Sequence, residues 1–130
     1  MSLSKLAVYR LTKLANYMQA LPKSADKHFD MNAWFWHNDK HDHGFKSGQP
    51  ITRHDLTLCG TTACAMGWAA TIPAFNQAGL KVDQWGSLSI LPGRFFDITD
   101  FEAHRLFFDF GIKTPKEWAR RCHQFIKDKK

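Results

Sequence analysis

The chain has few cysteines and no long apolar run. There are three cysteines among 130 residues, and an odd number argues against a disulfide framework and favours a reducing compartment. No apolar run approaches the roughly 20 residues needed to span a bilayer. The first residues alternate polar and apolar types, unlike a signal peptide. We therefore expect a cytoplasmic protein without membrane contact.

Acidic residues are missing from the first 23 positions. That segment carries a charge of +4 and residues 113–130 carry +5, whereas the chain between them is net acidic. Basic segments of this kind mark a surface for nucleic acid or for an acidic partner; the alternative is two solvated helix faces that keep the protein soluble. The candidate binding residues are Arg10, Lys13, Arg120, Arg121 and Lys127.

Repeats, low-complexity segments, phosphate-binding glycine loops and nucleophile elbows are also missing. Aromatic residues are instead plentiful, with 11 Phe and 5 Trp, and the apolar fraction is 44%. Such a composition suits a well-packed core and argues against disorder. At this length we expect one core and a single domain over residues 1–130.

Helical periodicity recurs along the chain. Leu3 to Leu21 places apolar residues on one face, which predicts an amphipathic helix closed by Pro22. Thr99 to Glu102 is a capping box opening a helix that runs to about Phe108, and Thr114 to Glu117 repeats the device with proline at the first helical position. Residues 74–78 and 94–97 are expected to form short helical turns. Residues 80–82 and 88–90 alternate around a turn and predict a β-hairpin.

The stretch from Cys59 to Ala70 predicts a buried central helix. Gly60 suits a tight turn, Thr61 or Thr62 is a candidate N-cap, and Pro73 is expected to stop the helix. A stripe of small residues would let another backbone approach closely, and we expect the N- or C-terminal helix there. That stripe is Ala63, Gly67 and Ala70. The fold class is therefore mainly α (α+β): a compact bundle of about four to five helices around a short central helix, with one small β-hairpin.

The same stretch contains a candidate nucleophile. Cys64 falls in the first turn of the expected helix, where free N–H groups and the helix dipole favour a thiolate. A thiol hydrolase would use Cys64 or Cys59, with a histidine as base and an aspartate such as Asp97 to orient it. The candidate bases are His104, His54 and His43. The competing interpretation is that Cys64 is a small apolar residue packed in the core.

A histidine-rich segment is a candidate metal site. His37 and His41 would share a face at i, i+4 if the segment were helical, and His43 adds a third imidazole. With Asp39, Asp42, His54 or Cys59 they could hold zinc or a similar ion. The competing interpretation is a polar, solvated loop, and we expect no other cofactor.

Several segments resemble a group of small phage and prophage proteins. The resemblance rests on Phe29-Asp30-Met31-x-x-Trp34, on Cys-Gly-Thr-x-Ala-Cys-Ala-x-Gly-Trp-Ala at 59–69 and on Ile72-Pro73-x-Phe75. It continues through Thr114-Pro115-Lys116-Glu117 and covers about residues 29–126. It implies a setting, the cytoplasm of a phage host, and no mechanism. The segment from His37 to His43 departs from that pattern, so zinc binding is not implied as a shared property.

Three functions follow as hypotheses. The first is an accessory protein that binds a host protein, for example to counter a bacterial defence system, and it follows from small size, basic ends and an incomplete catalytic set. The second is the thiol hydrolase built on Cys64. The third is a nucleic-acid-binding protein that uses its basic end helices.

Overall fold

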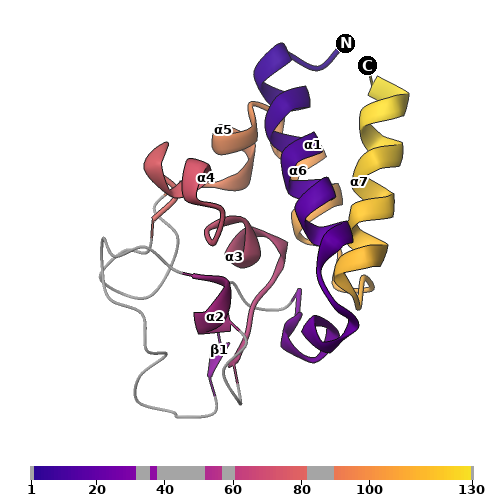
Figure 1. Ribbon diagram of the computed structural model, residues 1–130. Helices are drawn as coiled ribbons and strands as arrows, with labels where there is room; N and C mark the ends of the chain where they lie inside the picture. Colours follow the sequence, from indigo (N-terminus) through magenta and orange to yellow (C-terminus); the bar gives the residue numbers. More distant parts are fainter. Residues whose placement is uncertain (1, 32–35, 38–51, 57–60, 82–89, 130) are drawn as a thin grey trace.

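Two long helices from opposite ends of the chain lie side by side in the computed structural model (Figure 1). They are α1 (Lys5–Ala20) and α7 (Pro115–Lys129), and they run antiparallel. The N–H of Leu3 donates to the carbonyl of Lys129 at 3.4 Å, which joins the start of α1 to the end of α7. The structure describes residues 2–31, 36–37, 52–56, 61–81 and 90–129.

The N-terminal helix forms where its periodicity predicted it. Ser4 is the N-cap, and its Oγ accepts from the N–H of Ala7 at 3.0 Å. Leu21 is extended ahead of Pro22, as expected before a proline. The face that packs inward is buried and consists of Ala7, Leu11, Leu14, Ala15 and Met18.

Caps also fix the two C-terminal helices. In α6 (Asp100–Phe107) the capping box at Thr99 and Glu102 is complete, which confirms the prediction. At α7 the Oγ of Thr114 accepts from the N–H of Glu117 at 3.1 Å. The carboxylate of Glu117, however, accepts from the N–H of Lys113 at 2.8 Å. The second box is therefore shifted by one residue relative to the expected pattern.

Five short helices connect these long ones, so the described residues contain more helices than the four to five expected. They are a 3-10 helix over Lys23–His28 and the α-helices α2 (Arg53–Leu56), α3 (Ala65–Ala69), α4 (Pro73–Gln77) and α5 (Pro92–Phe96). A helix of four or five residues is shorter than the window over which periodicity is measurable. Residues 22–58 therefore show no helical periodicity in the sequence, although they include the 3-10 helix and α2.

The central helix is shorter than predicted. Thr61 and Thr62 are not N-caps, because they form strand β2 (Thr61–Thr62), which pairs antiparallel with β1 (Trp36–His37). The N-cap is Cys64. Pro73 begins α4 rather than ending α3.

Two further predictions fall partly outside the described residues. The aromatic-rich sequence from Asp30 to Trp36 also predicts one helical turn, and this prediction is wrong at its end, because Trp36 belongs to β1. Of the predicted hairpin, residues 82–89 lie outside the described residues. The predicted turn at 74–78 is confirmed as α4, and Gly79 follows it with φ 111°.

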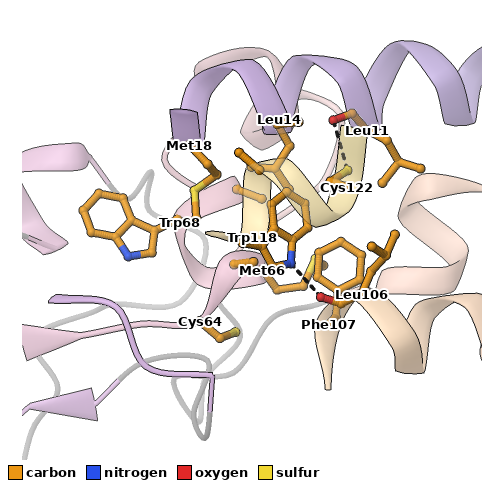
Figure 2. Close-up of a cluster of buried hydrophobic side chains, with 14 of the residues drawn as sticks. Leu11, Leu14, Met18, Cys64, Met66, Trp68, Leu106, Phe107, Trp118 and Cys122 are labelled. Atoms are coloured by element: carbon orange, nitrogen blue, oxygen red, sulfur yellow. Dashed lines mark hydrogen bonds between the residues drawn. The ribbon is translucent and has the colours of Figure 1, made fainter. Parts of the chain in front are cut away.

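One apolar cluster joins these elements. Figure 2 shows Met66 and Trp68 of α3 among side chains of α1, α6 and α7. Trp118 is fully buried, and its Nε1 donates to the carbonyl of Leu106 at 2.6 Å. None of the described helices is long and apolar enough to cross a membrane. The described fold is thus predominantly helical, with α3 at its centre.

Candidate functional site

The two basic ends of the sequence meet in space. Because α1 and α7 are packed antiparallel, residues 1–23 and 113–130 become neighbours (Figure 1). The first segment carries +4 and the last +5, while the rest of the chain carries −3. The tertiary structure therefore brings the two net basic segments of the sequence together.

A surface groove of about 650 Å³ opens beside this pair. We call it the basic groove. Its lining consists of Gln19, Lys116, Arg120, His123, Gln124 and Lys127. Among these described lining residues none is acidic and none is Phe, Tyr or Trp, so the groove offers cationic, imidazole and amide groups and no carboxylate of its own.

The basic residues of the groove form one helical stripe. Lys116, Arg120, His123 and Lys127 follow one another at intervals of four, three and four residues. Residues three and four apart occupy neighbouring positions on a helix surface. Within the described part of the chain Arg120 and Lys127 make no hydrogen bond or ion pair, and both are exposed.

Lys116 anchors one end of this stripe to α1. Its Nζ donates to the carbonyl of Gln19 at 2.8 Å and to that of Leu21 at 3.3 Å. These carbonyls belong to the C-terminal end of α1, which lacks a basic residue in its own last turn. Lys116 therefore acts as a C-cap supplied by another helix, and its ammonium group is held in place at the edge of the groove.

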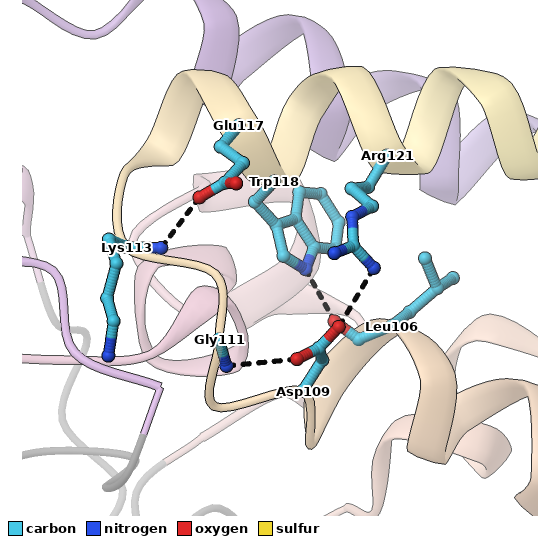
Figure 3. Close-up of polar contacts among 7 residues, drawn as sticks. All are labelled: Leu106, Asp109, Gly111, Lys113, Glu117, Trp118 and Arg121. Atoms are coloured by element: carbon cyan, nitrogen blue, oxygen red, sulfur yellow. Dashed lines mark hydrogen bonds and ion pairs between the residues drawn. The ribbon is translucent and has the colours of Figure 1, made fainter.

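Three other predicted binding residues lie outside the groove lining. Figure 3 shows Arg121 donating to Asp109 at 2.8 Å, a contact between α7 and the turn that precedes it. Arg10 lies 4.1 Å from the ring centroid of Phe95 and donates to the Phe95 carbonyl, which ties α1 to α5. Lys13 lies over the ring of Tyr9 at 6.0 Å. Arg10 and Arg121 therefore hold elements together.

The environment of Cys64 opposes an ionised thiol. Cys64 is 1% exposed at the N-cap of α3 (Figure 2). Burial raises the pKa of its thiol to about 11, although hydrogen bonds from backbone N–H groups such as that of Gly67 lower it. Desolvation is the larger effect, so the helix terminus does not yield a thiolate at neutral pH. This direction is opposite to the one that the thiol-hydrolase hypothesis needs.

The proposed partners of that cysteine are scattered or outside the described residues. His104 is exposed on α6, where its ring lies 4.8 Å from that of Phe108. Asp97 is exposed at the end of α5. His54 belongs to α2, and its side chain is not among those described. Cys59 and His43 lie outside the described residues.

The candidate zinc site falls mostly outside the described residues as well. His41 and His43 are both among those not described. His37 is paired in strand β1, so its spacing to His41 is not that of a continuous helix. Among the described residues there is no group of three potential metal ligands.

Comparisons with protein-family models, curated proteins and solved structures found no match to this chain.

Sequence reasoning found two members of the groove, Arg120 and Lys127, and missed four. The helical interval of four, three and four residues that adds Lys116 and His123 is visible in the sequence. Gln19 and Gln124 had no such signal, because only the packing of α1 on α7 brings them together. The basic groove is the candidate functional site.

Proposed function

We propose that this protein works by binding, and that the basic groove receives an acidic surface of a partner protein. The observation that supports the proposal is the groove itself, with its stripe of basic residues and a described lining free of carboxylates. Charged groups arranged in this way steer an oppositely charged partner and fix its orientation. The setting we propose is the cytoplasm of a phage host, where the protein acts as an accessory factor on a host protein.

The small number of acidic residues on α1 and α7 strengthens the electrostatic argument. Helix α1 contains no acidic residue. On α7 the carboxylate of Glu117 accepts from the N–H of Lys113, and that of Asp128 accepts from Gln124 at 2.8 Å. Both donors are uncharged, so the two carboxylates keep their negative charge, but α1 and α7 together hold eight lysines and arginines against these two acids and the pair of helices remains net basic.

A protein partner fits the groove better than single-stranded nucleic acid does. Proteins that bind single strands stack bases on aromatic side chains in addition to contacting phosphates. The described lining of the groove supplies amides and cations, and its only ring is the imidazole of His123, with no Phe, Tyr or Trp among the lining residues. The exposed aromatic residues Tyr9, Phe101 and Phe110 are not among the groove residues.

The test is a capture experiment with charge-reversed variants. Immobilised wild type and the double variant Arg120→Glu/Lys127→Glu are exposed to bacterial lysate treated with nuclease. Arg105→Glu serves as the matched control, because Arg105 is exposed on α6 away from the groove. We expect proteins that wild type and the control retain and the double variant loses, with retention falling as salt increases.

Two outcomes would overturn the proposal. One is a set of captured proteins that is the same for all three forms. The other is capture by the wild type from a parallel lysate without nuclease that is absent from the treated lysate, which would favour the nucleic-acid alternative, whose affinity depends steeply on salt. Circular dichroism of the double variant verifies that the fold is intact, as expected for two exposed side chains.

A further inference from the structure

The spacing of charges in the basic groove identifies the shape of its partner. This inference rests on the proposed function, because it assumes that the groove binds protein. Along α7 the stripe from Lys116 to Lys127 extends over about 16 Å, with intervals of about 6, 4.5 and 6 Å, since a helix rises about 1.5 Å per residue. We propose that the groove accepts an acidic α-helix whose carboxylates follow the same intervals.

A helix matches these intervals and an extended strand does not. In a strand the side chains of one face recur about every 6.6 Å. Over the three intervals of the stripe an extended peptide would therefore shift by about 3 Å relative to a helix. A helix with acids at i, i+4, i+7 and i+11 lying along α7 places one carboxylate near each of Lys116, Arg120, His123 and Lys127.

The walls of the groove suit the same shape. Gln19 on α1 and Gln124 on α7 add amide groups at its lining. Two antiparallel helices leave a furrow along their junction, and a third helix packs into such a furrow by ridges and grooves. Since five of its six described lining residues belong to α7, the groove runs along α7, and a third helix bound there would lie along α7 against the basic stripe.

The fixed position of the Lys116 side chain supports a defined register of the partner helix along α7. Its Nζ is held by the carbonyls of Gln19 and Leu21 at 2.8 and 3.3 Å. An ammonium group that is already fixed loses less rotamer entropy on binding than a free one. Lys116 also retains a third N–H for a carboxylate, and it marks the end of the stripe from which the partner helix is aligned.

Two isomeric peptides test the inference. Both are blocked helical peptides of about 18 residues, long enough to form a helix in part, and both contain four glutamates. In the first the glutamates follow i, i+4, i+7 and i+11; in the second they are distributed around the helix. Titration into ¹⁵N-labelled protein, followed by amide chemical shifts, gives both the affinity and the location of binding.

We expect the first peptide to bind about fivefold more tightly than its isomer, as two additional surface ion pairs would give. The amide shift changes that it causes are expected along α1 and α7. They should disappear in Arg120→Glu/Lys127→Glu and persist in Arg105→Glu. If both peptides bound the groove equally, the inference that the partner is an acidic helix of matching spacing would be wrong. The proposed function would not be affected. Binding of duplex DNA at the groove, with neither peptide bound, would overturn both.

Discussion

At the scale of single residues, burial dominates the chemistry of this protein. Cys64 is at a helix N-terminus, the usual environment of an activated thiol, yet desolvation outweighs the backbone hydrogen bonds and raises its pKa to about 11. Cys122 behaves alike: burial raises its pKa to about 12, and its Sγ donates to the carbonyl of Leu11 at 3.7 Å. Both thiols are parts of the core rather than reactive groups at neutral pH.

The raised pKa of Cys64 predicts a loss of stability in alkali. The unfolded chain releases the thiol proton near its ordinary value of 9.0, whereas the folded chain retains it to about 11. The free energy of unfolding is therefore unaffected below the lower value and falls as the pH rises through this interval. Urea melts at a series of pH values measure it.

The variant Cys64→Ser isolates this contribution. It removes the thiol, so its stability is expected to decline less steeply over the same interval. Cys122 and Tyr17, whose pKa burial also raises, titrate in both proteins and cancel in the comparison. Parallel curves for the two proteins would show that Cys64 ionises as freely in the fold as in the unfolded chain.

At the scale of elements, α3 is the centre of packing although it is only five residues long. Every residue of Ala65–Ala69 is buried. The small-residue stripe is buried as predicted, but Ala63 precedes the helix and bridges to Phe29. Its N–H donates to His28 and its carbonyl accepts from Asp30, at 3.0 and 2.9 Å. At Ala63 the paired backbone is thus residues 28–30 and not an end helix.

Gly67→Leu tests the packing of α3. Gly67 is buried in the middle of this helix, and a leucine side chain would have to displace the surrounding core. Overpacking of this kind costs about 1–3 kcal/mol, sometimes more, so the melting temperature is expected to drop by several degrees. Lys127→Leu, on the exposed face of α7, is the control and is expected to change stability by less than about 0.5 kcal/mol. Indistinguishable thermal melts for Gly67→Leu and the parent would place α3 outside the packed centre.

At the scale of the whole molecule, charge is segregated. The net charge is +6, with the basic ends together on α1 and α7 and a net acidic remainder. Like charges on neighbouring helices repel, and the repulsion works against the compact state. The groove therefore suits an acidic partner, and the repulsion between its basic residues lowers the free energy of unfolding of the unbound protein.

This segregation predicts that salt stabilises the free protein. The Debye length decreases from about 30 Å at 0.01 M to about 8 Å at 0.15 M ionic strength, so sodium chloride screens the repulsion between α1 and α7. The melting temperature is expected to rise over that range, and to rise less in Arg120→Gln/Lys127→Gln. A melting temperature that is constant or falls as salt is added would contradict the interpretation.

Local signals in the sequence determined the long helices and their ends. Periodicity placed α1, and the residues Thr99, Glu102, Thr114 and Pro115 placed the starts of α6 and α7, because caps and proline act through bonds within one turn. The identity of the basic residues was equally plain. Local signals did not determine the short elements. Thr61 and Thr62, for example, have the side chains of N-caps, and only pairing with β1 makes them a strand.

The candidate site depended on tertiary structure. The sequence alone shows two separate basic ends, and the antiparallel packing of α1 on α7 brings them together beside one groove. In the fold Lys116 binds carbonyls of α1. Arg10 and Arg121 instead make contacts within the protein. Likewise, a helix start made Cys64 a candidate nucleophile, and only its burial fixed the direction of its pKa. Desolvation and contacts between distant segments depend on the assembled core, which no local pattern encodes.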